Sequence, residues 1–363
     1  MGVTNRAGRR YLRSEPREAV AERRVDFGMI PGVSVGQAES PERASGVTVV
    51  LFDHAVPMVV DVRGGASATY DTASLSLDAT FGRRWAVFFS GGSLFGLDAA
   101  RGVRTRILEV GGGHRAFSNP NVVVPISGAA LFDLPTRRAG IPDYLPLGYE
   151  AARQAAPGPV ATGRVGAGAG ATVGKYLGRQ RAMPGGIGAA AACMDRLGTV
   201  GVLVAVNSVG AIRDPSSGAW IAGAKGRKGG VDPPRFPGVF HRPERGTTLG
   251  IVVTDVAVGR PALARIAHMV HAGIASAISP YHSTSDGDVL FVASTERLHP
   301  PRREAWPGEV ADRLGRRAAD LAVVAVLDAV RPEKSGSFRP STEGASRGRS
   351  HRTRANSRRE SFR

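Results

Sequence analysis

One glycine–threonine junction is the first candidate for a chemical site in this sequence. The stretch HRPERGTTLGIVVTDVAVG, residues 241–259, begins as a polar, basic loop and becomes an apolar, strand-like run at Ile251. Gly246 and Thr247 stand at the joint between the two. A structural interpretation needs only a turn glycine followed by a β-branched residue that suits a strand. A chemical interpretation is that the Gly246–Thr247 bond is cut, which makes Thr247 an N-terminal nucleophile.

Two further groups of polar residues stand next to predicted strands. Asn207 ends the apolar run VLVAVN, where a polar amide either caps the next turn or points into a site. Asp286 and Asp288 flank Gly287 just before the run VLFVAS. Aspartate and glycine are turn formers, so, taken alone, this pair is better explained by a plain β-turn than by a functional site. From the residues alone, both alternatives stay open.

The glycine-rich stretch VGAGAGATVGK, residues 165–175, does not fit a nucleotide site. A P-loop needs a glycine five residues before its Gly-Lys pair and Ser or Thr after the lysine. Ala169 and Tyr176 occupy those two positions. A dinucleotide fingerprint needs a preceding strand, and residues 158–164 make a poor one. Glycines that let backbone pack closely on backbone account for the stretch.

Other catalytic and metal signatures are also incomplete. His268 and His271 have no glutamate between them and fit no zinc-protease helix. The stretch GGSLFG has Phe95 where a serine-hydrolase elbow needs glycine. The single cysteine, Cys193, leaves neither an internal disulfide nor a cysteine cluster for zinc. These observations favour a site without a metal.

The charge is concentrated at the two ends of the 363-residue chain. Of the formal net charge of +17, residues 1–25 supply +4 (seven Arg against three Glu), and residues 331–363 supply +7 (nine Arg and one Lys against three Glu). The C-terminal stretch has almost no hydrophobic residues, so we expect it to be disordered. Arginine-rich tails can bind polyanions, with an affinity that falls steeply in salt. A polyanion-binding protein is therefore one alternative function.

The sequence between the tails is typical of one continuous α/β domain in a soluble, cytoplasmic protein. No apolar run reaches the roughly 18 residues of a membrane span, and the N-terminus lacks the apolar core of a secretory signal. Apolar runs predict paired strands at 46–53 and 58–65, and further strands at 83–93, 121–133, 198–210, 248–255 and 288–295. Helical spacing predicts helices at 94–113, 148–156, 260–278 and 307–330. The stretch 223–246, rich in Gly, Pro and charge, is the longest predicted surface loop.

Eight motifs in register resemble the L-aminopeptidase/D-esterase family, which includes the DmpA-type and β-peptidyl aminopeptidases. In chain order they are PGVSVG, VDVRGGASATYDT, GGSLFGLDAARGV, VGAGAGATVGK, GGIGAAA, VGVLVAVNSVG, GTTLGIVVTD and SDGDVLFVAS. The resemblance runs from about residue 28 to about residue 297. It implies a four-layer αββα sandwich, a precursor that cuts itself into two subunits that stay together, no cofactor, and a homo-oligomer of cleaved protomers. The fold is shared with the ornithine acetyltransferases.

By this resemblance, Thr247 attacks the carbonyl of Gly246, an N-to-O acyl shift gives an ester, and water cleaves the ester. Physical chemistry is consistent with these steps. Glycine lacks a Cβ, so its peptide can be held in a strained geometry that favours attack. The freed α-amine of Thr247 can act as the base for its own hydroxyl, because such amines titrate near about pH 7.7–8.0 in simple peptides. The chemistry needs no histidine.

The resemblance also implies roles for other residues. Asn207 matches the asparagine that donates to the tetrahedral oxyanion. Asp286 and Asp288 match a turn whose acidic residues orient the nucleophile's amine or hold the ammonium of the substrate. Phe132 stands where some relatives carry an aromatic hydroxyl. A tyrosine contribution to substrate binding is then missing or comes from elsewhere, such as Tyr149.

We therefore expect three segments: a basic, flexible N-terminal segment over 1–27, a catalytic domain over 28–330 and a disordered Arg/Ser-rich tail over 331–363. Cleavage between 246 and 247 would give an α subunit 1–246 and a β subunit 247–363. The expected function is an autoprocessed aminopeptidase that releases N-terminal residues from small peptides, amides or esters through an acyl-Thr247 intermediate. The alternatives on the same fold are an acyltransferase of the ornithine acetyltransferase type and a degenerate member that never cleaves.

Overall fold

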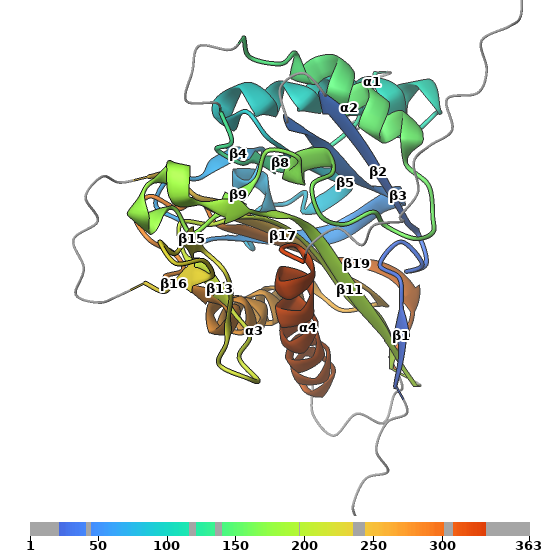
Figure 1. Cartoon of the computed structure of the whole chain (residues 1–363). Coiled ribbons are helices and arrows are strands. Elements are labelled where there is room, and N and C mark those ends of the chain that lie inside the picture. Colours follow the sequence, from blue (N-terminus) through green and yellow to red (C-terminus); the bar gives the residue numbers. More distant parts are fainter. Residues whose placement is uncertain are drawn as a thin grey trace, which may run out of the picture. The chain divides into compact units, whose positions relative to one another are not determined.

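Ten strands of the protein belong to one hydrogen-bonded sheet. Their order is β1-β11-β12-β17-β19-β3-β5-β8-β4, and β2 pairs with β3 beside this path. The computed structural model describes residues 22–40, 45–115, 121–134, 140–195, 197–234, 244–300 and 308–331 (Figure 1).

The elements have the following bounds. The strands of the large sheet are β1 (Glu22–Val25), β2 (Val33–Ser40), β3 (Ser45–Val62), β4 (Ala68–Tyr70), β5 (Arg83–Ser90), β8 (Ile126–Ala130), β11 (Gly186–Met194), β12 (Gly198–Asn207), β17 (Thr247–Val256) and β19 (Val289–Leu298). The short strands are β6 (His114–Arg115), β7 (Val122–Val123), β9 (Thr172–Val173), β10 (Met183–Pro184), β13 (Ala211–Arg213), β14 (Trp220–Ala222), β15 (Ala224–Lys225), β16 (Val231–Asp232) and β18 (Ile278–Ser279). The α-helices are α1 (Ala99–Glu109), α2 (Tyr144–Gln154), α3 (Arg260–Ala277) and α4 (Glu309–Asp328). Turns of 3₁₀-helix occur at Ala73–Leu75, Ser93–Asp98, Gly166–Gly168, Lys175–Leu177 and Arg179–Arg181.

Strand β3 joins the two halves of the large sheet. Its first part, residues 45–52, pairs with β2 and β5, and its last part, residues 58–62, pairs with β19. The prediction of two paired strands in this region is wrong. The chain stays extended and the register with β5 shifts between Leu51 and Val56. Because each part of β3 finds partners in other strands, the chain needs no turn between them.

Alternate residues of the central strands face opposite layers. In β12, Val202 and Val204 pack with residues of α3 and α4. Leu203 and Ala205, between and after them, pack with residues of β3 and β5 from the other half of the sheet. On the far side of that half, Phe88 packs with α1 and α2. Two pairs of helices thus enclose two layers of strands, which confirms the predicted αββα sandwich (Figure 1).

Strand β11 is an element that the sequence analysis did not predict. Its sequence, GIGAAAACM, lacks the bulky β-branched and aromatic residues that favour strands. Its small residues serve packing instead. A methyl group on Gly188 would lie 1.9 Å from the carbonyl oxygen of Ala325 in α4. The backbone of α4 therefore rests directly on the backbone of β11.

The four predicted helices are present, with some ends displaced. The helices expected at 260–278 and 307–330 are α3 and α4. The one expected at 148–156 is α2, which begins earlier because the Asp143 carboxylate caps it, accepting from the Leu145 backbone N–H at 3.1 Å. The one expected at 94–113 is α1, preceded by a 3₁₀ turn.

The N-terminal part of the sheet begins earlier than expected. Residues 22–25 form β1 along the edge of β11, and Phe27 is buried in the core between the strand layers. The expected flexible segment therefore does not extend to residue 27, because a paired strand and a core residue lie within it. Residues 1–21 and the basic tail after Arg331 lie outside the described residues. Within the described part of the chain, no helix is long and apolar enough to cross a membrane.

Candidate active site

Thr247 is the first residue of β17, a strand that is buried along its whole length. It lies directly opposite Asn207, the last residue of β12, in the antiparallel register of these two strands. On the other side β17 runs parallel to β19, which brings the turn before β19 to the same end of the sheet. The topology therefore brings together three segments that are far apart in the sequence.

Backbone contacts fix the junction before β17. The Gly246 N–H donates to the Ser285 carbonyl at 3.1 Å, and the Gly287 N–H donates to the Gly246 carbonyl oxygen at 3.0 Å. The Thr247 hydroxyl donates to the same oxygen at 2.5 Å. The hydroxyl thus lies beside the carbonyl of the preceding peptide. That carbonyl already accepts a hydrogen bond from a second donor.

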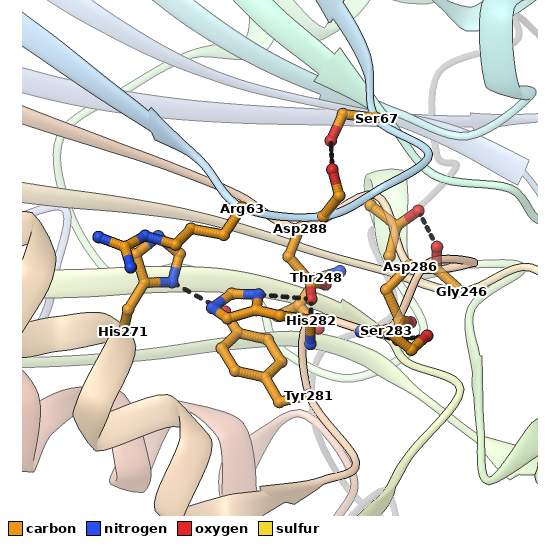
Figure 2. Close-up of polar contacts among 12 residues, drawn as sticks. Arg63, Ser67, Gly246, Thr248, His271, Tyr281, His282, Ser283, Asp286 and Asp288 are labelled. Atoms are coloured by element: carbon orange, nitrogen blue, oxygen red, sulfur yellow. Dashed lines mark hydrogen bonds and ion pairs between the residues drawn. The ribbon is translucent and has the colours of Figure 1, made fainter.

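Asp286 lies beside this junction, in the turn before β19 (Figure 2). One carboxylate oxygen, Oδ1, accepts from the Val209 N–H at 3.1 Å, and Oδ2 accepts from the Ser283 N–H at 3.3 Å and hydroxyl at 2.5 Å. Burial raises the pKa of Asp286, and the nearby Asp288 carboxylate raises it further. These donors offset part of that effect because they stabilise the ionised form.

Asp288 is fully buried and makes a different set of contacts. Its Oδ1 accepts from the Thr248 N–H at 2.7 Å, and its Oδ2 accepts from the N–H and the ring Nδ1 of His282 at 3.0 and 2.9 Å. The His282 ring lies against Tyr281, with ring centroids 3.7 Å apart (Figure 2). Asp288 therefore fixes the backbone just after Thr247, whereas Asp286 borders the peptide just before it.

The side-chain amide of Asn207 is fixed by contacts on both of its polar atoms. Its Oδ1 accepts from the Thr172 N–H at 3.0 Å and from Lys175 Nζ at 2.9 Å. Its Nδ2 donates to the Phe132 carbonyl at 3.0 Å. An amide nitrogen carries two hydrogens, so one remains for another acceptor. The pair of donors at Oδ1 determines which way the amide is turned.

Lys175 is a site residue that sequence reasoning missed. Its side chain is buried, and Nζ donates to the Thr172 carbonyl at 2.8 Å and to the Asn207 carbonyl at 2.6 Å, besides Asn207 Oδ1. Burial lowers the pKa of Lys175 to about 7, against the raising effect of Asp286. The lysine ends the glycine-rich stretch that the sequence analysis tested only as a phosphate loop. Its burial next to Asn207 gives no signal in the sequence.

The two predicted substrate-binding aromatics lie in different places. Phe132 is half-buried beside Asn207, and the Arg245 guanidinium lies 5.5 Å from the centre of its ring. The structure does not bring Tyr149 to this group. Its hydroxyl is on α2 and donates to the Glu109 carboxylate of α1 at 2.8 Å. Gly246, Thr247, Asn207, Asp286, Asp288 and Phe132 are brought together.

His268 and His271, which the sequence analysis considered as metal ligands, lie on α3 near Asp61. His268 and His271 approach the Asp61 carboxylate with Nε2–Oδ2 distances of 3.7 and 3.8 Å. Burial lowers the pKa of His271 to about 4. Among the described residues, no group of three or more His, Cys, Asp or Glu is arranged to hold a metal ion.

Known proteins share this fold and much of this sequence. The family model described as Peptidase family S58 matches residues 29–336. An uncharacterized aminopeptidase of Mycobacterium tuberculosis is 35% identical over 306 residues, covering 79% of this chain and 86% of the relative. A 6-aminohexanoate-oligomer endohydrolase of Kocuria sp. is 32% identical over 328 residues, covering 86% of this chain and 84% of the relative. The solved L-aminopeptidase D-Ala-esterase/amidase of Ochrobactrum anthropi, a variant of the Ntn hydrolase fold, superposes with a TM-score of 0.59 at 19% identity over 84% of this chain and 85% of that chain.

Proposed function

The chain belongs to peptidase family S58, and on that premise we propose that it cuts its own Gly246–Thr247 bond and then works as an aminopeptidase with Thr247 as N-terminal nucleophile. The coarser statement, that it is a hydrolase of the aminopeptidase type, follows from the family and from the relatives with that name. Neither the family nor these relatives favour the acyltransferase alternative. The cytoplasmic location, the homo-oligomer and a contact of the basic tails with polyanions stay predictions.

One observation carries the proposal of self-cleavage. The Thr247 hydroxyl lies 2.5 Å from the Gly246 carbonyl oxygen, and the Gly287 N–H lies 3.0 Å from the same oxygen. When Thr247 Oγ1 attacks the carbonyl carbon, negative charge develops on an oxygen that already has a donor. Losing one such donor typically costs about 10²–10³-fold in rate.

The processing steps balance as follows. Thr247 Oγ1 loses its proton and forms a bond to the Gly246 carbonyl carbon, the C–N bond breaks, and the nitrogen takes up the proton that the hydroxyl lost to become the α-amine of Thr247. Water then hydrolyses the resulting ester, which leaves the Gly246 carboxylate and the Thr247 hydroxyl. The α-amine is now next to the hydroxyl and can act as its base.

Catalysis on a substrate repeats these steps with a separate amide or ester. The α-amine of Thr247 takes the hydroxyl proton, and Oγ1 attacks the substrate carbonyl. The oxyanion accepts from the Gly287 N–H, as in processing, and from the second N–H of Asn207, with the Lys175 side chain behind it. The amine passes the proton to the leaving group, and water releases the acyl group from Thr247. The Asp286 carboxylate offers a charged partner to the ammonium of an unblocked substrate.

The intact mass of the denatured protein tests the proposal. We expect two pieces, 1–246 and 247–363, from the wild-type chain and one full-length piece from Thr247→Ala. Thr248→Ala is the matched control, because this neighbouring threonine is also buried and its hydroxyl has no hydrogen-bond partner among the described residues. The control variant should still be cut. A full-length wild-type protein would remove the free α-amine and overturn the mechanism.

A further inference from the structure

His282 lies between β18 and β19 with its backbone in the left-handed region, at φ +61°. A residue other than glycine rarely keeps this conformation unless the surrounding structure holds it there, and residues held in this way are concentrated at functional sites. Here the backbone N–H and the ring Nδ1 of His282 both reach one oxygen, Asp288 Oδ2, at 3.0 and 2.9 Å. One strained residue thus supplies two donors to one buried carboxylate oxygen.

The His282 ring is itself fixed by two aromatic neighbours (Figure 2). The Tyr281 ring lies against it with centroids 3.7 Å apart, and the His271 ring of α3 meets it at 68° with centroids 4.8 Å apart. These neighbours are joined in turn, because the Tyr281 hydroxyl contacts His271 Nδ1 at 3.2 Å. His271 Nε2 lies 3.8 Å from the Asp61 carboxylate. The His282 ring therefore has little freedom to turn away from Asp288.

The Asp288 carboxylate connects this ring to the groups that meet at the Gly246–Thr247 peptide. Its other oxygen, Oδ1, accepts from the Thr248 N–H at 2.7 Å and so fixes the residue directly after Thr247. The residue directly before Asp288 is Gly287, whose N–H donates to the Gly246 carbonyl oxygen at 3.0 Å. A shift of the Asp288 carboxylate would therefore move the Thr247 hydroxyl relative to the carbonyl and its donor.

We infer that His282 is a positioning residue for self-cleavage and for hydrolysis: its ring N–H fixes the Asp288 carboxylate, which in turn sets the Thr247 hydroxyl against the carbonyl that it attacks. This inference rests on the proposed function. Among the described residues, the His282 ring is hydrogen-bonded to Asp288 alone, so it acts through that carboxylate. An ionised carboxylate only accepts hydrogen bonds, so the ring hydrogen stands on Nδ1.

Two amide substitutions separate the ring N–H from the packing of the ring. In His282→Asn the amide nitrogen stands as many bonds from the backbone as Nδ1, and asparagine tolerates the left-handed backbone. In His282→Gln the amide nitrogen stands one bond further out, in the place of Nε2. We expect His282→Gln to slow self-cleavage and to lower kcat by on the order of 10–100-fold, with little change in KM, because a misplacement of about 1 Å can cost about 10²-fold. His282→Asn should stay close to wild type.

Self-cleavage is followed as the mass of pulse-labelled chain over time. The kinetic constants kcat and KM are measured on whichever p-nitroanilide of glycine, L-alanine or β-alanine the wild type hydrolyses fastest. His268→Gln is the matched control and should behave as wild type, because this exposed histidine of α3 approaches Asp61 instead of Asp288.

The outcomes separate the inference from the proposed function. A His282→Asn variant as slow as His282→Gln would show that the ring itself is needed and not its N–H, and would overturn the inference. A His282→Gln variant as fast as wild type would overturn it too. Both results leave the self-cleaving wild type intact. A wild-type chain that is never cut would instead reject the proposed function, and the inference with it.

Discussion

Two polar regions flank Thr247 and are built in opposite ways. On the side of β19, the carboxylates of Asp286 and Asp288 are surrounded by N–H and O–H donors. On the side of β12, the Lys175 amine is surrounded by oxygen acceptors, two of them from Asn207. Each region thus surrounds its buried ionisable group with hydrogen-bond partners that stabilise the charged form.

This difference in partners shows how a carboxylate and an amine can both be buried in one site. Burial raises the pKa of Asp286 and lowers the pKa of Lys175, so it drives each group toward its neutral form. Each of the two also stabilises the charge of the other. Thr247, at the start of β17, lies between the ends of β12 and β19 from which these two groups approach. A substitution of Asp286 or Lys175 should therefore change the pKa of the other residue.

The largest expected effect comes from neutralising the carboxylate nearest the scissile peptide. Asp286→Asn keeps the shape and an acceptor for Val209 but removes the charge that the proposal pairs with the substrate's ammonium, so we expect kcat/KM to fall by on the order of 10³-fold, the size of the loss when a buried charge is left without its partner. The same change further lowers the pKa of Lys175, because Asp286 raises it. Asp288→Asn should cost less activity, because Asp288 contacts Thr248 and His282 and does not border the Gly246 peptide. Both variants should lose stability, because the new amide nitrogen faces two donors of Ser283 in one and two donors of His282 in the other. Hydrolysis rates and urea unfolding of the two variants test these expectations. Equal losses of activity in the two variants would contradict the different roles of Asp286 and Asp288.

The next effect should come from the cationic side. Lys175→Met removes one of the two donors to Asn207 Oδ1 and leaves only the Thr172 N–H, so the amide is held less firmly and donates less well to the oxyanion. We expect kcat/KM to fall by about 10²-fold with little change in KM. Lys225→Met is the control, because that side chain is exposed on β15. An unchanged kcat would show that the contact of Lys175 with Asn207 Oδ1 is not required to orient the amide.

The pH dependence of the free energy of unfolding tests whether the pKa of Lys175 is lowered in the folded protein. Burial lowers the pKa of Lys175 to about 7, below its ordinary value. Above that pH the unfolded chain binds more protons than the folded one, so the free energy of unfolding should rise with pH. Between about pH 7 and about pH 9 this single group should contribute about 2 kcal/mol. The quantity to measure is the difference in unfolding free energy between wild type and Lys175→Met at both pH values. A difference that does not increase with pH contradicts the lowered pKa.

The smallest effects should distinguish the two aromatics. Phe132→Leu keeps the carbonyl that Asn207 contacts but removes the ring beneath Arg245, and we expect processing to slow by about 2–5-fold, the size of an exposed cation–π contact. Tyr149→Phe should leave the rate unchanged, because its hydroxyl contacts Glu109 in the helical layer. Time courses of both variants on one gel give the comparison. If Tyr149→Phe slowed processing more than Phe132→Leu does, the contact between α1 and α2 would have to influence the site.

The sequence predicted the carboxylate side better than the cationic side. Asp286 and Asp288 stand where a turn enters an apolar strand, and Thr247 and Asn207 stand at the ends of such strands. Strand boundaries therefore marked all four as candidates, and the family resemblance gave them their expected roles. Lys175 carries no such mark, because its burial depends on how residues 165–175 fold over the end of β12. Strand β11 escaped prediction for a related reason: its alanines and glycines are chosen by the contact with α4, which no local pattern reveals.

The sheet order has a consequence for the protein after a cut between Gly246 and Thr247. Strands β17 and β19 would belong to one product, yet they lie between β12 and β3 of the other. The products are then interleaved within a single sheet, and separating them requires breaking the ladders on both sides. Dissociation and unfolding become one event, and reassembly becomes a bimolecular reaction. The midpoint of thermal unfolding should then depend more steeply on protein concentration in the cut protein than in Thr247→Ala.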